Sequence, residues 1–139
     1  MKQKVCVVLL VIVCFCSGCG LFGLQQYTCD VDNVKSVQIV QLDGIIGGKY
    51  EWEYTVLCEI SDKDAFVNRL TSMKHKVNWG DPGVHNEGDI VIRIEFLNGE
   101  YDLIHHYAQT LRCPNTNRTG FFFFDKDQFN ALIADYLPQ

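Results

Sequence analysis

The sequence lacks the short motifs that mark common catalytic and nucleotide-binding sites. It holds no Gly-x-Ser-x-Gly and no His-Glu-x-x-His, so neither a hydrolase elbow nor a zinc-protease helix is indicated. Its glycine-rich stretch, residues 43–48, has no Gly-Lys-Ser/Thr ending and no helix pattern behind it, which excludes a phosphate loop. Lysine and arginine form no cluster, and the formal charge is −5, so a nucleic-acid backbone would repel the chain. We therefore expect no enzyme, no cofactor and no nucleic-acid partner.

What is present is the composition of one globular domain. The chain has 139 residues, of which 47% are hydrophobic and 21% are charged. That length is enough for one domain, and the balance is typical of a folded chain rather than a disordered one.

The N-terminus carries the most specific functional signal. A short basic stretch, residues 1–4, precedes an unbroken apolar run, residues 5–15, and Cys16-Ser17-Gly18-Cys19 follows. This pattern resembles the signal peptide of bacterial lipoproteins, whose lipobox is an aliphatic residue, a small residue, Gly or Ala, and then Cys. The last three of these residues match the lipobox, whereas Cys16 stands where Leu is usual.

The resemblance implies cleavage before Cys19 and a diacylglycerol on the Cys19 thiol. Two or more acyl chains give stable anchoring, since each buried methylene contributes about 0.8 kcal/mol. The predicted division is a signal peptide over residues 1–18, a lipidated N-terminus and tether over residues 19–33, and one domain over residues 34–139. The predicted location is the extracytoplasmic side of a bacterial membrane in the cell envelope, with that membrane as a partner through Cys19.

Two other interpretations of the N-terminus remain. Residues 5–24 carry no charge and are just long enough to span a bilayer as an uncleaved anchor. An ordinary secretory signal peptide has similar flanks. All three interpretations put the domain outside the cytoplasm. Beyond the lipobox, the chain is similar in size and pattern to small lipoproteins of clostridial gut anaerobes, a resemblance that implies no catalytic residues.

Processing would leave Cys29, Cys58 and Cys113 in the domain. An odd number of thiols in an oxidising compartment permits one bridge within the chain. Cys58 alternates in phase with apolar neighbours and is expected on a core face, whereas Cys29 and Cys113 lie in polar, irregular segments. We predict a Cys29–Cys113 disulfide and a buried, reduced Cys58; three free thiols are the alternative. No Cys-x-x-Cys pair would survive to suggest zinc.

The domain is expected to be organised around a β-hairpin over residues 89–104. Apolar and polar residues alternate on both sides of Asn98-Gly99, a pair that tolerates the positive φ angles of a two-residue type I′ turn. That turn would place Ile94 opposite Leu103 and Ile92 opposite His105 on the core face.

Hydrophobic periodicity predicts the remaining elements. The period of two indicates further strands over residues 34–42, 50–60, 73–79 and 121–124. One helix is expected to begin at Ser61 and end near Ser72, and another to begin at Asp125 with Gln128 completing a capping box. The predicted fold class is α+β, an antiparallel sheet of about six strands with two amphipathic helices, in the order β-β-α-β-β-β-β-α.

The histidines and a polar loop are the places where chemistry could occur. Adjacent residues on a strand point to opposite faces, so His105 and His106 are not expected to share an ion. The loop residues Asp81, His85, Glu87 and Asp89 offer possible ligands, but their spacing matches no calcium or zinc motif. A small enzyme would need a cleft that gathers Asp81, His85 or a free cysteine.

The second face of the sheet suggests an interaction surface. Leu57, Val91, Leu97 and Ile104 are expected to point away from the core, and a contiguous apolar patch usually marks a binding site. The alternative is that the helices and the long loop cover both faces. The sequence therefore favours a membrane-tethered binding module with a protein partner; the alternative is an inhibitor or immunity factor against a toxin or envelope hydrolase, because an acidic chain suits a basic target.

Overall fold

The fold is seen in a computed structural model, which describes residues 26–46, 51–75, 84–106, 110–112, 118–120 and 122–137. The helical elements within these residues are η1 (Val31–Asn33), α2 (Lys63–Thr71) and α3 (Lys126–Ala134). The strands are β1 (Val34–Ile45), β2 (Trp52–Glu59), β3 (Ile90–Phe96), β4 (Tyr101–Ile104), β5 (Thr110–Arg112) and β6 (Arg118–Gly120).

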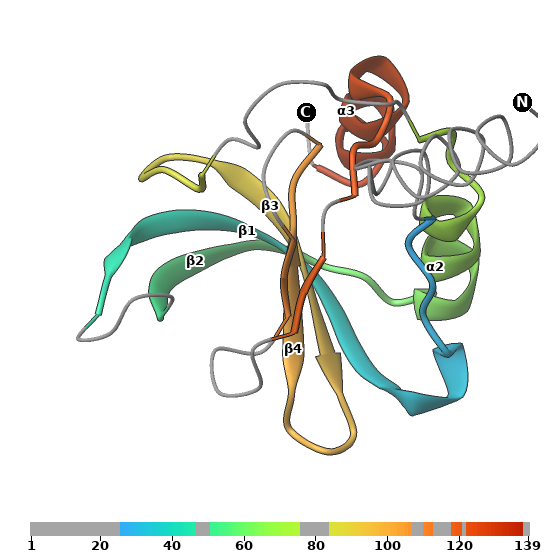
Figure 1. The fold of residues 1–139 in the computed structure, drawn as a ribbon, viewed down its shortest axis with the longest axis horizontal. Coiled ribbons are helices and arrows are strands. Elements are labelled where there is room, and N and C mark those ends of the chain that lie inside the picture. The colour runs from blue at the N-terminus through green and yellow to red at the C-terminus, as the bar shows by residue number, and fades with distance from the viewer. Residues whose placement is uncertain are drawn as a thin grey trace, which may run out of the picture.

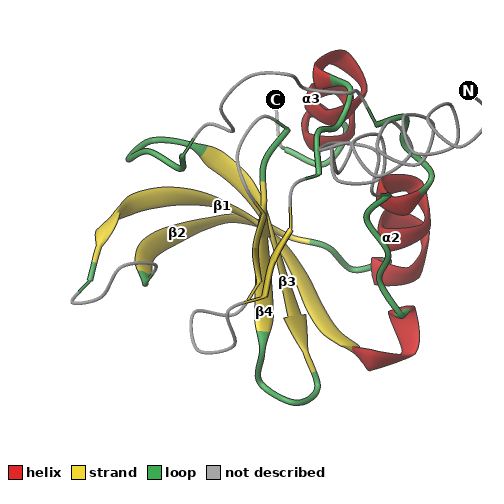
Figure 2. Cartoon of the chain, in the orientation of Figure 1, coloured by secondary structure: helices red, strands yellow, loops and turns green. Residues whose placement is uncertain are grey.

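The domain is α+β, with the two α-helices of the described chain on the same side of one antiparallel sheet (Figure 1). The strand order across the sheet is β2-β1-β3-β4-β5-β6, and every adjacent pair is antiparallel. The predicted fold class, antiparallel pairing and two helices are confirmed. β3 and β4 lie at the centre of this order, β2 lies at one edge, and β1 lies next to that edge (Figure 2).

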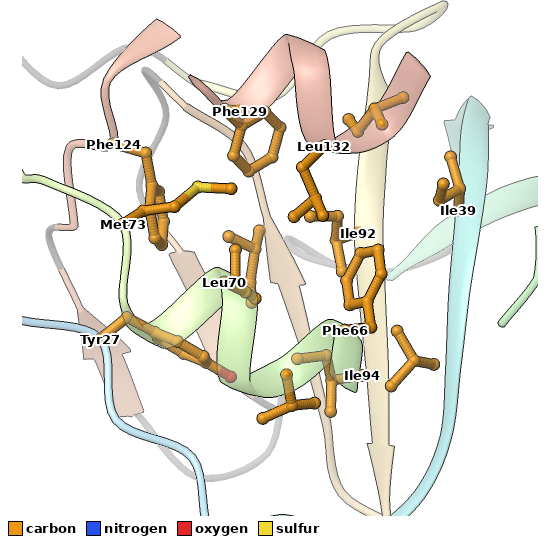
Figure 3. Close-up of a cluster of buried hydrophobic side chains, with 14 of the residues drawn as sticks. Tyr27, Ile39, Phe66, Leu70, Met73, Ile92, Ile94, Phe124, Phe129 and Leu132 are labelled. Atoms are coloured by element: carbon orange, nitrogen blue, oxygen red, sulfur yellow. The ribbon is translucent and has the colours of Figure 1, made fainter. Parts of the chain in front are cut away.

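The principal core fills the space between the sheet and both helices (Figure 3). Period-two apolar residues of the strands meet the apolar stripes of the helices there, as both patterns require. The fully buried residues at its centre are Tyr27, Val37, Ile39, Phe66, Leu70, Ile92, Ile94, Ile104, Phe129 and Leu132.

The central hairpin forms, but its predicted register is wrong by one residue. Ile92 pairs with Ile104 and Ile94 pairs with Asp102. The amide of Gly99 donates to the carbonyl of Phe96 at 3.0 Å, and Gly99 has a φ of 84°. These features fit a three-residue loop that ends in a left-handed glycine, which is the next most common hairpin loop after the two-residue turn.

Two predicted strands are not strands within the described residues. His75 and Phe124 form only an isolated bridge with each other, and residues 76–79 and 121 lie outside the described chain. Phe122, Phe123 and Phe124 are buried nonetheless. The strands β5 and β6 were not predicted, and they lie on either side of Cys113 in a stretch that the sequence shows only as polar and irregular. Three-residue strands carry too short a pattern to detect.

Both predicted helices form: α2 has nearly the predicted extent, and α3 begins where predicted and ends at Ala134. Asp62, not Ser61, caps α2, since its Oδ1 accepts a hydrogen bond from the amide of Ala65 at 3.0 Å. Asp125 caps α3 as predicted, but Gln128 does not complete the capping box. Its Oε1 accepts from the amide of Lys74 at 3.3 Å, and the Asp125 amide donates to the Lys74 carbonyl at 3.0 Å.

The packed domain includes residues upstream of the predicted boundary at Val34. The Tyr27 side chain has no exposed surface, and its hydroxyl donates to Oδ2 of Asp102 at 2.7 Å. The Tyr27 amide donates to Nε2 of His75 at 3.2 Å. The chain is therefore held against the sheet and α2 from Tyr27 onward, so a tether from Cys19 would end near Gln26.

Candidate functional site

The face of the sheet opposite the helices, called the second face below, carries its own apolar cluster. Val40 and Leu42 of β1, Val91 of β3 and Leu103 of β4 are buried there. Trp52 and Tyr101 pack against this cluster from β2 and β4. The sheet therefore buries apolar side chains on both faces, although both helices lie on one of them.

Arg93 lies between two aromatic rings on the second face. Its guanidinium carbon is 5.1 Å from the ring centre of Tyr54 and 4.9 Å from that of Tyr101. Tyr54 belongs to β2 and Tyr101 to β4, with β1 and β3 between them in the sheet. Rings so close to one cation indicate that the sheet curves toward this face, as twisted sheets do, and cation–π attraction favours the arrangement.

Glu95 forms ion pairs with both Arg93 and Lys35. Arg93 Nη1 lies 2.8 Å from one carboxylate oxygen of Glu95, and Lys35 Nζ lies 2.5 Å from the other. Hydrogen bonds from Lys35 and then Arg93 lower the pKa of Glu95. This charged group thus closes one end of the second-face cluster and keeps one net positive charge, with the exposed Lys35 as its outermost cation.

Among the strands whose side-chain exposure is described, β1 to β4, β2 is the most accessible. Within the described chain, β2 pairs with β1 alone, and Glu53, Tyr54, Thr55 and Val56 are all exposed. The exposed fractions of Tyr54 and Val56 are 38% and 44%. We call the outer side of Trp52–Glu59 the β2 edge. An extended strand with unpaired backbone groups and exposed apolar side chains is a natural template for another strand.

Three histidine rings, from two segments of the chain, lie close together beside α3. The ring centres of His85 and His105 are 6.4 Å apart, and those of His105 and His106 are 4.3 Å apart. The expectation that His105 and His106 point to opposite faces is wrong, because β4 ends at Ile104 and strand alternation stops there. Both rings also contact Phe129 of α3.

Burial makes the imidazoles of His105 and His106 hard to protonate, because it lowers the pKa of each. Desolvation, followed by the neighbouring His106 and His85, lowers the pKa of His105 to about 4, although Asp89 acts in the opposite direction. Desolvation also lowers the pKa of His106, with a further contribution from Lys126. No three His, Cys, Asp or Glu side chains within the described residues are arranged to hold a metal ion. His105 and His106 are thus suited to remaining neutral, and they favour an acid-sensitive fold.

The structure does not bring the four predicted interaction residues together. Val91 lies on the second face but is buried, and Ile104 is buried in the principal core. Leu57 packs against the principal core, and Leu97 is 67% exposed in the hairpin loop. The register shift moves Ile104 to the other face, and a bulge at Leu57 interrupts the alternation of β2.

The cysteines are placed only in part. Cys58 is a free thiol that packs against the principal core, whereas Trp52 packs on the second face. The same bulge at Leu57 puts these two residues on opposite faces, so Cys58 does not alternate in phase with Trp52. Cys58 lies against a core as predicted, but it is half-buried rather than buried. Cys29 is half-buried beside the principal core. Cys19, Cys113 and Asp81 lie outside the described residues.

Sequence reasoning missed the set formed by Tyr54, Arg93 and Tyr101. The alternation of β3 puts Arg93 on the same face as Val91, but local alternation does not show the two tyrosines of β2 and β4 that flank its guanidinium. No family model, curated protein or solved structure matches the chain. Within the described residues, no helix is both long and apolar enough to cross a membrane.

Proposed function

We propose that this chain is a lipid-anchored binding module on the extracytoplasmic side of a bacterial membrane, and that it contacts a protein partner through the β2 edge. The lipobox pattern that ends at Cys19 supports the anchoring, and the exposure of the β2 edge supports the binding. The single observation that carries the binding proposal is an eight-residue strand that pairs on one side only within the described residues and whose central side chains are exposed.

The lipid anchor would hold this edge close to the membrane. The chain is packed into the domain from Tyr27 onward. The linker from Cys19 to Gln26 can therefore reach at most about 25 Å when fully extended. A partner would have to lie in or near the same membrane, which raises its effective concentration.

The β2 edge is tested by site-specific photo-crosslinking in native envelopes. A benzophenone amino acid replaces Val56 in one variant and Asn130, an exposed residue of α3, in the matched control. We expect one discrete adduct from position 56 and none of that mass from position 130. Excess wild-type protein should compete for the adduct, whereas a Val56→Lys protein should not. Equal labelling from both positions contradicts the proposal.

Anchoring is tested separately by mass spectrometry of the purified native chain. We expect a mature N-terminus at Cys19 with acyl mass, and loss of that mass in Cys19→Ser. A wild-type chain that retains Met1 contradicts the lipoprotein proposal and leaves the β2 edge to be judged by crosslinking.

The alternative function is that of an inhibitor or immunity factor against a toxin or envelope hydrolase. Glu51, Glu53 and Glu59 are exposed on or beside β2, and such a surface complements a basic target. If the adduct contains a hydrolase or toxin, the purified chain should inhibit its activity, and Val56→Lys should weaken that inhibition.

A further inference from the structure

We propose that the partner of the β2 edge is an extended cationic segment, in which apolar residues alternate with lysine or arginine and which adds to the sheet as a further strand. This inference rests on the proposed function and names the chemistry of its partner. Three properties of β2 carry it: the outer side of its backbone, which pairs with no other described strand, its two rows of side chains and its charge.

The backbone of β2 offers hydrogen bonds along a considerable length. Its eight residues, Trp52–Glu59, pair with β1 on one side, so alternate amides and carbonyls face away from the sheet. At about 3.3 Å per residue the strand is roughly 26 Å long. Natural proteins commonly protect such edges with lysine or proline, and β2 contains neither. The bulge at Leu57 shortens the regular part but leaves Trp52–Val56 uninterrupted by a bulge within β2.

The side chains of β2 define two different rows. Tyr54 and Val56 pair with Leu42 and Val40, two buried residues of the second face, and Trp52 packs against the same cluster. This row is apolar and partly exposed. The intervening residues, Glu53 and Thr55, are exposed and polar. Because residues opposite each other on neighbouring strands share a face, the added strand needs alternating apolar and polar positions.

The negative charge of β2 favours lysine or arginine at the polar positions of the added strand. The same charge disfavours pairing of β2 with a second copy of this chain. Glu51, Glu53 and Glu59 are exposed, as is Asp43, which accepts a hydrogen bond from Thr55 at 2.8 Å. Residues 51–60 contain no lysine or arginine. Two copies joined edge to edge would bring carboxylates close to carboxylates, and like charges on adjacent strands destabilise the pairing. Lysine or arginine at those positions would instead be attracted.

The test measures binding of synthetic octapeptides to the purified full-length chain in detergent, at 150 mM salt, by calorimetry. The probe is an alternating Val-Lys peptide. Its controls are the same peptide with N-methyl groups on alternate residues, which keeps the charge but removes backbone donors, and an alternating Val-Glu peptide. We expect each control to bind at least tenfold more weakly than the probe.

Protein variants separate local from overall charge. Glu53→Lys reverses a charge on β2, and Asp64→Lys makes the same change at an exposed position of α2. The first should weaken binding of the Val-Lys peptide at least tenfold, and the second should change it less than twofold. Val56→Lys, which adds a charge to the apolar row without burying it, should also weaken binding at least tenfold.

Several outcomes overturn the inference. N-methylated peptide that binds within twofold of the probe would mean attraction by charge without strand addition, and equal binding of the Val-Glu peptide would remove the cationic preference. A dimer seen by sedimentation that Val56→Lys abolishes would make a second copy the occupant. The two proposals can fail separately. A crosslink at position 56 without peptide binding rejects only the proposed chemistry of the partner. The absence of that crosslink rejects the β2 edge as a binding site.

Discussion

The hydroxyl of Tyr27 donates a 2.7 Å hydrogen bond to Oδ2 of Asp102, and both side chains are buried. Asp102 lies on β4 opposite Ile94, on the face of the sheet that meets the helices. The contact therefore joins a residue upstream of η1 to the middle of the sheet. It satisfies part of the hydrogen-bonding capacity of a carboxyl group in an apolar setting, where an unmet polar group is costly.

Removing the Tyr27 hydroxyl should destabilise the domain. Tyr27→Phe keeps the ring and its edge contact with Phe122, whose centre lies 5.3 Å away, but takes one donor from the buried Asp102. We expect the free energy of unfolding in urea to fall by about 1–3 kcal/mol.

The matched control is Tyr54→Phe, in which the side chain is 38% exposed and keeps its ring over Arg93. This change should alter the free energy of unfolding by less than about 0.5 kcal/mol. Equal effects of the two substitutions would show that the Tyr27 hydroxyl has no special role.

Asp102 shows why the strand pairing could be predicted but its register could not. Alternation and Asn98-Gly99 identify a hairpin, and the hairpin is present. The segment Tyr101-Asp102-Leu103-Ile104 has apolar residues on both faces, so its pattern does not choose between two registers that differ by one residue. The observed register puts Asp102 on the buried face of the sheet, where its carboxyl group needs a hydrogen-bond partner. Tyr27, which is distant in sequence, supplies that partner, so the hairpin sequence alone does not determine the register.

The backbone conformation of Gly99 in the hairpin loop can be tested with Gly44 of β1 as the control. Gly99 has a φ of 84°, and a Cβ built on it would meet no atom within 4 Å. Gly99→Ala should therefore cost only the strain of a left-handed alanine, about 1 kcal/mol. Gly44 of β1 also has open space at its Cβ but has no positive φ.

We expect Gly44→Ala to be neutral or slightly stabilising, since alanine lowers the entropy of the unfolded chain. The comparison uses urea unfolding of both variants under the same conditions. If Gly99→Ala is as stable as Gly44→Ala, the left-handed conformation at Gly99 does not govern the loop.

The buried histidine should make the fold sensitive to acid. The pKa of His105 falls from 6.5 to about 4 on folding, so the unfolded chain binds the proton more tightly than the folded chain. Stability is then complete above pH 6.5 and is lost as the pH falls from 6.5 toward 4. At pH 4.5 the loss from His105 alone is about 2.5 kcal/mol, since each pKa unit corresponds to about 1.4 kcal/mol.

The measurement is urea unfolding of wild type and His105→Gln at pH 7.5 and pH 4.5. Glutamine does not titrate, so the difference in free energy between the two pH values should shrink by about 2.5 kcal/mol in the variant. Lowered pKa values at His75 and His106 act in the same direction, and some acid sensitivity should therefore remain. An unchanged pH dependence would mean that His105 titrates alike in both states.

The candidate site was less predictable than the fold because it depends on the curvature of the sheet. The sequence shows Tyr54 in an apolar row with Trp52 and Val56, and it shows Arg93 between apolar neighbours. It does not show that β2 and β4 approach the same guanidinium, because neither twist nor the position of a bulge follows from local periodicity. The exposure of β2 likewise follows from the strand order, which is a property of the whole sheet.

Arg93 should stabilise the curved sheet more than its charge alone would suggest. Its side chain is 11% exposed, and it contacts two rings and a carboxylate. Arg93→Lys keeps a positive charge near Glu95 but loses the planar stacking group that covers Tyr54 and Tyr101. We expect the free energy of unfolding to fall by about 1–2 kcal/mol, from cation–π contacts worth about 0.5–1 kcal/mol each.

The control for Arg93 is Lys35→Ala, which removes the other cation from Glu95. The Lys35 side chain is 60% exposed, so this ion pair is screened by solvent and should contribute less than about 1 kcal/mol. High salt should reduce the effect of Lys35→Ala and leave that of Arg93→Lys nearly unchanged, because buried contacts are screened less than exposed pairs. If both effects fall equally with salt, Arg93 acts as an ordinary surface charge, and the curvature of β2 toward β4 must have another cause.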